Sequence, residues 1–297
     1  MTASVDSRTG FFYGIAANVL WGVLPLYLNM LKGVDALQVL SHRVVWSLVM
    51  FGAIIAVSGR LRTLLVAARG RTLGLLTISA ALIAVNWFVY IWSAANGHLV
   101  EASLGYFITP LVNVALGTVL LRERLTCSQA VAIGIAGTGV LILSVTGGGE
   151  IWISLTLALS FGFYGLIRKV VAIDALSGLT IETALLAPLA ILILCYVGTT
   201  SEAAFGQGSR IDALLILAGP ITALPLLLFA ASVKRLRYTT LGLLQFIAPT
   251  LLLAEAVLLY QEPIGSIQLA TFSLIWIGCG LYAWSSIISS RSLSVQA

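Results

Sequence analysis

The sequence predicts an all-α polytopic membrane protein, and two observations carry that prediction. Of the 297 residues 60% are hydrophobic and only 9% are charged, and the mean hydropathy is +1.06. A soluble domain carries about 25% charged residues, so this chain has too few to cover a surface that faces water. Its apolar residues also gather in ten runs, each of about the 20 residues that a helix needs to cross a bilayer.

Short loops join the ten expected transmembrane helices and leave no room for a soluble domain. The spans cover residues 11–31, 37–57, 73–94, 101–121, 128–146, 151–170, 180–199, 211–231, 239–260 and 267–288. The polar start MTASVDSRTG precedes one apolar run among many, so we expect no cleaved leader peptide. Cys127, Cys195 and Cys279 lack the spacing of metal ligands, so we expect no disulfide framework, metal or cofactor.

The basic residues are distributed unevenly over the loops, which indicates the direction of the chain in the membrane. With the N-terminus in the cytoplasm, the inner loops and inner helix ends hold Arg8, Arg60, Arg62, Arg69, Arg71, Arg122, Arg124, Arg168, Lys169, Lys234, Arg235, Arg237 and Arg291. Only Lys32, Arg43 and Arg210 remain for the outer side or the spans. The sequence therefore predicts that both termini are cytoplasmic. The net charge of +5 reflects this orientation and does not indicate nucleic-acid binding.

One helix recurs half a chain later. EASLGYFITPLVNVALGTVLLRE, residues 101–123, matches TLGLLQFIAPTLLLAEAVLLYQE, residues 240–262, without a gap, including Phe-Ile-x-Pro and the final Glu. Chance similarity between two Leu-rich helices is a poor alternative for so regular a match. Because an odd number of spans separates the copies, they cross the membrane in opposite directions. The sequence thus predicts an inverted five-plus-five repeat, residues 1–146 and 147–297, which is a common plan for secondary transporters.

Five stretches resemble the drug/metabolite transporter superfamily of EamA type and, within it, the RarD-like branch. They are WGVLPLY (21–27), SHRVVWS (41–47), NWFVYIWSAANGHLVEASLGYFITPL (86–111), FGFYGLIRK (161–169) and QFIAPT (245–250). The resemblance covers essentially the whole chain. It implies a metabolite exporter of the bacterial inner membrane. In the neighbouring aromatic-amino-acid exporter branch, amino acids are the best-supported substrate class.

Polar groups within spans tend to face the interior of a helix bundle. On that ground we expect the substrate to be bound by Trp21, His42, Arg43, Trp46, Asn86, Trp87, Tyr90, Tyr106, Tyr164 and Gln245. Asn86 and Tyr90 share a helix face, and with Trp87 they suit a zwitterion that carries an apolar side chain; packing between helices is their alternative role. Arg43 either snorkels to the interface or holds a carboxylate in a two-bonded fork. His42 is a candidate for proton exchange.

Two prolines and two carboxylates are candidates for gating and coupling. Pro110 and Pro249 occupy matching positions in the repeated helix, where a proline bends the chain; a purely structural kink is the alternative. Glu101 starts a span, where a negative charge suits the helix dipole, or it takes part in proton or amine binding. Glu255 lies inside an apolar run and is a candidate proton carrier or ammonium partner, or it pairs with an arginine or stays protonated. Glu123 ends its span and is assigned to loop structure or gating.

These features predict a secondary exporter of small metabolites, most directly amino acids, that works by alternating access. The chain has no GxxxxGK[ST] nucleotide motif, and two histidines without HExxH or GxSxG argue against an enzyme. The alternative is a proton-coupled exporter of cationic drugs, which would favour buried carboxylates. The expected partners are a small-molecule substrate and membrane lipid. Small-residue stretches at 132–140 and 277–284 fit either tight packing in a monomer or a homodimer face.

Overall fold

The computed structural model describes residues 2–96, 98–146, 150–200, 202–259 and 265–295, and every regular element within these ranges is an α-helix. The helices are α1 (Thr2–Gly22), α2 (Leu24–Met30), α3 (Ala36–Val57), α4 (Leu61–Ala67), α5 (Gly70–Ala95), α6 (Leu99–Val119), α7 (Cys127–Thr146), α8 (Ile151–Val170), α9 (Ala175–Gly198), α10 (Ser209–Arg235), α11 (Tyr238–Leu244), α12 (Ile247–Leu258) and α13 (Ser266–Val295).

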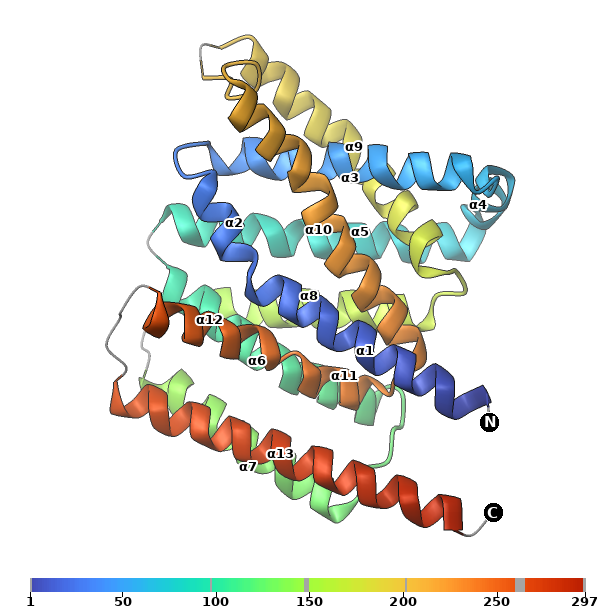
Figure 1. The fold of residues 1–297 in the computed structure, drawn as a ribbon, viewed down its shortest axis with the longest axis vertical. Helices are drawn as coiled ribbons and strands as arrows, with labels where there is room; N and C mark the ends of the chain where they lie inside the picture. Colours follow the sequence, from blue (N-terminus) through green and yellow to red (C-terminus); the bar gives the residue numbers. More distant parts are fainter. Residues whose placement is uncertain (1, 97, 147–149, 201, 260–264, 296–297) are drawn as a thin grey trace.

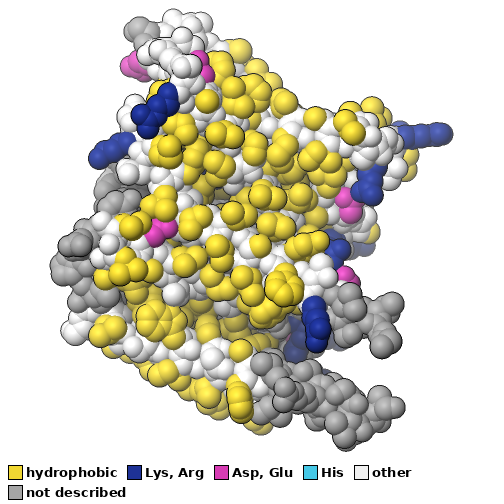
Figure 2. Space-filling view, in the orientation of Figure 1, with side chains coloured by type: hydrophobic (Ala, Val, Ile, Leu, Met, Phe, Trp, Pro, Cys, Tyr) yellow, Lys and Arg dark blue, Asp and Glu magenta, His cyan; other side chains and the backbone are white. Residues whose placement is uncertain are grey.

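Seven helical stretches in the described ranges are long and apolar enough to cross a membrane. They are Asp6–Met30, Ala36–Val57, Gly70–Ser93, Glu101–Val119, Ile151–Val170, Ala175–Gly198 and Ser209–Arg235. Two shorter apolar helical stretches, Cys127–Ile142 and Leu269–Ser285, accompany them. Hydrophobic side chains cover most of the face shown in Figure 2. The chain is therefore an all-α polytopic membrane protein, as its composition predicts.

Two helix breaks lie next to a proline, whereas α6, α9 and α10 continue past Pro110, Pro188, Pro220 and Pro225. A proline lacks the N–H that bonds the carbonyl four residues earlier, and its ring crowds that carbonyl. Pro25 follows the break between α1 and α2 at Val23, and Pro249 follows the break between α11 and α12 at Gln245 and Phe246. In contrast, α6 runs uninterrupted past Pro110. The two matched prolines therefore lie in different local structure: Pro110 is inside a continuous helix, and Pro249 follows a break.

Figure 1 shows that both termini and α4 lie at one end of the bundle, which we call the termini end. The α6–α7, α8–α9 and α10–α11 connections lie there too. Most of the Lys and Arg side chains visible in Figure 2 are on this side. The short helix α4 was not expected from the sequence, because its seven residues are too few to show a period. Its Leu64 packs with Ile55, Leu76 and Val171.

The helices pack in a defined pattern of pairs. The extensive contacts join α1 with α10 and α12, α3 with α9 and α10, α5 with α8 and α9, and α6 with α8 and α11. The helices α7 and α13 pair with each other at one edge of the bundle (Figure 1). The largest core cluster among the described residues joins α1, α3, α5, α6, α8, α9, α10 and α11, and its Tyr164, Phe229 and Tyr238 are fully buried.

Bonds between helices hold the termini end together. The Lys169 ammonium at the end of α8 donates to the Val233 carbonyl of α10 at 3.1 Å. The Glu123 carboxylate accepts hydrogen bonds from the backbone N–H groups of Tyr238, at 2.6 Å, and Thr239, at 2.9 Å. It therefore satisfies free donors at the start of α11, as a capping residue does. Glu262, its match in the sequence repeat, lies outside the described residues.

Candidate functional site

A cavity of about 170 Å³ lies where the broken helices α1–α2 and α11–α12 meet α3, α5, α6, α8 and α10. One water needs about 10–15 Å³ on the same measure, so the cavity can hold a small metabolite. Eight expected residues line it: Trp21, Arg43, Asn86, Trp87, Tyr90, Tyr106, Gln245 and Pro249. Its lining includes α2 and the N-terminal halves of α3 and α6, which Figure 1 places away from the termini end.

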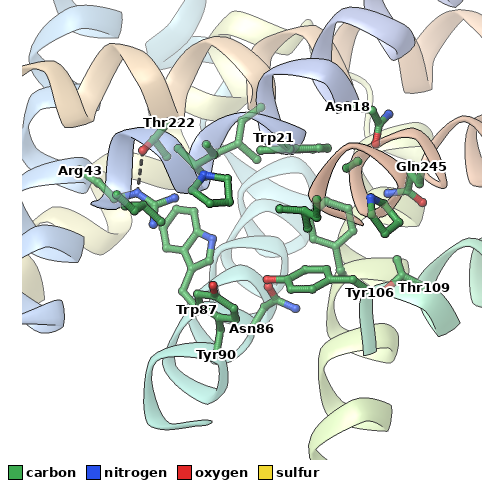
Figure 3. Close-up of a pocket in the computed structure, with 18 residues that line it drawn as sticks. Asn18, Trp21, Arg43, Asn86, Trp87, Tyr90, Tyr106, Thr109, Thr222 and Gln245 are labelled. Carbon is green, nitrogen blue, oxygen red and sulfur yellow. Dashed lines mark hydrogen bonds between the residues drawn. The ribbon is translucent and has the colours of Figure 1, made fainter. Parts of the chain in front are cut away.

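Arg43 is held at one side of this cavity by two contacts. Its Nε donates to Thr222 Oγ1 of α10 at 2.7 Å, and its guanidinium carbon lies 5.4 Å from the centre of the Trp87 ring. Figure 3 shows these three side chains together. No hydrogen bond or ion pair to the two terminal nitrogens of Arg43 exists among the residues that the structure describes. The guanidinium fork is therefore available to an anion.

Aromatic rings line the middle of the cavity. Tyr90 and Tyr106 meet edge to face with ring centres 5.9 Å apart. Trp21 lies 5.7 Å from Phe161 and 5.4 Å from Phe229, measured between ring centres. We call these last three residues the aromatic floor, because Trp21 and Phe161 line the cavity and pack on the core cluster to which Phe229 belongs. Such faces suit an apolar or aromatic group of a ligand.

Amide side chains lie at the far side of the cavity from Arg43, as Figure 3 shows for Asn18 and Gln245. Two amides of the cavity, Gln245 and Asn86, also form hydrogen bonds to neighbouring helices. Gln245 accepts a hydrogen bond from the Asn113 amide of α6. The Asn86 amide nitrogen donates to Leu157 O at 2.9 Å and to Ser160 Oγ at 3.0 Å, both on α8. Asn86 therefore lines the cavity and also joins α5 to α8.

Known proteins share this sequence and fold. Residues 8–145 match the EamA-like transporter family. An uncharacterized transporter of Pseudomonas aeruginosa, PA0485, is 43% identical over 98% of both chains. Protein RarD of Escherichia coli is 39% identical over 97% of this chain and 98% of its own. The chain belongs to the EamA-like transporter family. Its resemblance to the RarD-like branch of the drug/metabolite transporter superfamily is thereby confirmed.

A solved crystal structure matches this EamA-like transporter with a TM-score of 0.71, covering 92% of this chain and 96% of that one. The two sequences are 17% identical, so the match shows a shared fold and nothing about substrate. The chloramphenicol-sensitive protein RarD of Pseudomonas aeruginosa is 36% identical over 98% of both chains. The protein is therefore a multi-pass membrane transporter, and its family membership implies transport and not catalysis.

Three expected binding residues of the EamA-like transporter do not line the cavity. His42 is buried against Phe205, with ring centres 5.0 Å apart. It precedes Arg43 directly, and neighbours on a helix point about 100° apart, so His42 points toward Phe205 while Arg43 points into the cavity. Trp46 packs against Gly219 of α10, where an added Cβ would lie 2.4 Å from its own. Tyr164 is fully buried below Phe161, beyond the aromatic floor.

The remaining coupling candidates also lie outside the cavity. Glu101 is in the first turn of α6, and its Oε1 lies 3.5 Å from His98 Nδ1, which fits its expected place at a helix start. Glu255, on α12, is absent from the cavity lining, and its Oε1 is buried without a hydrogen-bond partner among the described residues. Pro110 is buried within α6 and does not line the cavity. No observation assigns any of these three a role in coupling.

The sequence did not indicate two threonines that belong to the site. Thr109 and Thr222 line the cavity, and Thr222 holds Arg43. Neither carries a charge, and threonine is common in apolar helices, so the sequence offers no reason to select them.

Glu182 does not line the cavity, but the sequence does mark it, because it is a carboxylate inside the apolar run 180–199. It is 2% exposed and lies 3.5 Å from the guanidinium of Arg168.

Proposed function

We propose that this EamA-like transporter is a secondary exporter of small carboxylate-bearing metabolites, most directly amino acids, across the bacterial inner membrane. One observation carries the proposal. Arg43 is the only charged side chain among the described residues that line the cavity, and its two terminal nitrogens have no partner there. A guanidinium in a membrane span is costly unless an anion or water meets it. A substrate carboxylate supplies that anion.

The geometry around Arg43 supports a defined binding mode. Thr222 occupies Nε, so the end of the fork remains for the two oxygens of a carboxylate, in paired charge-assisted bonds. The side chain of the substrate then lies against Trp21 and Tyr106 in the middle of the cavity. This arrangement suits aromatic and branched amino acids better than small ones, since the larger side chains bury more apolar area.

The alternative function, proton-coupled export of cationic drugs, receives less support. A cation would need a carboxylate in the cavity, and Glu255, the deep candidate, is not among the lining residues. The positive charge of Arg43 would repel a cation. One relative is named for chloramphenicol sensitivity, so chloramphenicol is a useful competitor in transport assays of this protein.

Alternating access through ten spans in an inverted five-plus-five repeat is supported by the helix contacts. Exchanging α1–α2 with α8, α3 with α9, α5 with α10, α6 with α11–α12 and α7 with α13 leaves the pattern of the extensive contacts unchanged. The contact of α1 with α10 becomes that of α8 with α5, and that of α3 with α10 becomes that of α9 with α5. The basic loops at the termini end support a cytoplasmic position for both termini.

Efflux from proteoliposomes tests the proposal. Vesicles would be loaded with labelled phenylalanine, leucine or alanine, or with a cationic dye, and efflux followed with and without a proton gradient. We expect efflux of the amino acids, fastest for phenylalanine and leucine, and none of the dye. Efflux of the dye alone, and only with the gradient, would replace this function by the cationic alternative. Empty liposomes and vesicles with heat-inactivated protein provide the background.

A further inference from the structure

A second polar site is buried about 10 Å farther along α8 than the cavity residue Phe161, seven residues on. Arg168 and Glu182 form an ion pair there, with Arg168 Nη1 and Glu182 Oε1 3.5 Å apart. Neither side chain is more than 3% exposed. Ser79 of α5 donates to the same carboxylate oxygen at 2.6 Å. Three helices, α5, α8 and α9, thus meet at this pair.

The Arg168–Glu182 pair leaves some of its hydrogen-bonding capacity unused. Arg168 Nη2 donates to the Ala175 carbonyl at 3.0 Å, while Nε has no partner among the described residues. The contact with Glu182 is a single long one and not the two-bonded fork that arginine and carboxylate prefer. Burying two charges costs several kcal/mol each unless geometry and further bonds compensate. Apolar residues at these two positions would pack the termini end at a lower cost in free energy. Stability alone therefore does not explain the pair.

The position of the pair relates it to the cavity. Arg168, Tyr164 and Phe161 follow one another on one side of α8, from the termini end to the aromatic floor. The floor rings and the buried Tyr164 lie between the two polar sites along this helix. A substrate that crosses the floor toward the termini end would meet Arg168 and Glu182 next.

The two halves of the chain place these groups at matching positions. Asp35 caps the start of α3 and accepts hydrogen bonds from Leu37 and Gln38 N–H. Asp174 caps the start of α9 and accepts one from Ser177 N–H. Both caps are followed by Ala-Leu, and Arg43 and Glu182 lie at the same distance beyond them. Glu182 therefore stands in the second half where the anion-binding Arg43 stands in the first.

We propose that Arg168 and Glu182 form a second substrate site, which faces the termini end when that end is open and which takes a zwitterionic amino acid. The substrate carboxylate binds Arg168, and its ammonium group binds Glu182. In the present structure both side chains are buried, and they neutralise each other in place of the substrate. This inference rests on the proposed function, because it assigns the same substrates to a different site.

This exchange of partners explains the loose geometry. A tight two-bonded pair would exclude the substrate, whereas a single long contact can be replaced by two separate bonds to the ligand. Gly178 of α9 leaves room for the guanidinium, since a Cβ there would clash with Arg168. The two sites also differ in selectivity. The only charged group of the described cavity lining is the Arg43 cation, so a ligand needs only a carboxylate to bind there. At the second site Glu182 recognises the amino group of the ligand as well.

Transport measured separately from each end of the protein tests the proposal. The full chain would be reconstituted, and a protease-removable tag on one terminus would define which end faces the medium. Phenylalanine and hydrocinnamate, the same molecule without the amino group, would be supplied to each end. In the wild type, hydrocinnamate should have a KM roughly tenfold or more above the phenylalanine value at the termini end, and much closer to it at the other end. Equal discrimination at both ends would overturn the second site.

Variants give an independent readout. Glu182→Gln should raise the KM for phenylalanine at the termini end by roughly tenfold, abolish the preference over hydrocinnamate there, and leave the KM at the other end unchanged. The exchange Arg168→Glu with Glu182→Arg keeps a pair of opposite charges, so a purely structural pair predicts full recovery of that KM. A substrate site predicts a normal melting temperature with the KM still raised.

The outcomes separate this inference from the proposed function. If the wild type carries neither phenylalanine, leucine nor alanine from either end, the proposed function is wrong and the second site falls with it. If the wild type carries them, and Glu182→Gln changes the KM at neither end or at both ends equally, only the second site is wrong. The comparison of the two substrates in the wild type decides the matter even if a variant does not fold.

Discussion

The third and ninth helices begin alike and end up in opposite surroundings. Both start at an aspartate cap followed by Ala-Leu, and both carry one charged residue two turns farther on. Arg43 on α3 lines a cavity and has no acidic partner among the described residues, whereas Glu182 on α9 is buried against Arg168. The local sequence sets where each helix starts. The helices packed around it decide whether its charge is free or paired.

This difference has an energetic consequence. The cavity can admit water or an anion, so removing the charge of Arg43 leaves no buried group stranded. The site of Glu182 is closed, so removing its partner strands a charge among apolar groups. Variants of Arg43 should therefore affect transport, and variants of Arg168 should affect stability first.

The largest effect is expected at Arg168. Arg168→Met leaves the Glu182 carboxylate unpaired and should lower the free energy of unfolding by about 3–5 kcal/mol. The paired change Arg168→Met with Glu182→Leu should recover most of that loss, because no charge then remains buried. Thermal unfolding in detergent measures both. A single variant as stable as the double one would mean that the carboxylate is not held as a charged partner.

The next effect is expected at Arg43. Arg43→Gln should reduce kcat/KM for amino-acid efflux about 10- to 100-fold, because one charge-assisted interaction contributes about 1.5–3 kcal/mol. The melting temperature should stay close to that of the wild type. Arg43→Lys keeps the charge without the fork and should lie between the two. Undiminished transport by Arg43→Gln would remove the main support for carboxylate binding.

A smaller effect on stability is expected where Glu123 caps α11. Glu123→Ala removes acceptors for the Tyr238 and Thr239 N–H groups and should cost about 1–2 kcal/mol. Glu202→Ala, on an exposed loop, is the matched control and should change stability by less than about 0.5 kcal/mol. The same loss in both variants would show that the cap contributes nothing of its own. Urea or thermal unfolding distinguishes the two.

Thr222 provides a finer test of the cavity. Thr222→Val keeps the shape but removes the acceptor for Arg43 Nε, which should raise the KM for amino acids about fivefold, as for one hydrogen bond of about 1 kcal/mol. Thr222→Ser retains the hydroxyl and should stay near the wild type. Equal KM values for all three proteins would mean that this bond does not orient the guanidinium.

The smallest effect is expected at Glu255. It does not line the cavity, so Glu255→Gln should change amino-acid efflux less than twofold, with or without a proton gradient. Loss of gradient-driven transport in this variant would restore Glu255 as a proton carrier. It would also favour the cationic alternative.

Seven of the ten expected spans agree with helices that can cross a membrane, because each of those apolar runs has the length that a membrane demands. The sequence also indicated Arg43, Trp87 and Tyr90 as residues of the bundle interior, since polar groups in spans avoid lipid, and all three line the cavity. It failed for His42 and Trp46 because helical spacing gives the angle between side chains but not which face meets a cavity. The core place of Tyr164 depends on Phe229 of α10, and the paired state of Glu182 depends on Arg168 of α8. Both contacts join different helices, so they form only in the folded bundle.

The two broken helices next to the cavity have a consequence for backbone exchange with solvent. The Phe246 N–H bonds to the carbonyl three residues back at 3.2 Å, and the Leu26 N–H does the same to Val23 at 3.2 Å. The Gln245 N–H is shared between the carbonyls three and four residues back, at 3.1 and 3.3 Å. Such short turns open more readily than a regular helix. Deuterium should therefore enter the chain at these positions, deep within the bundle, sooner than in the unbroken helices around them. A bound substrate would slow that labelling at both breaks at once.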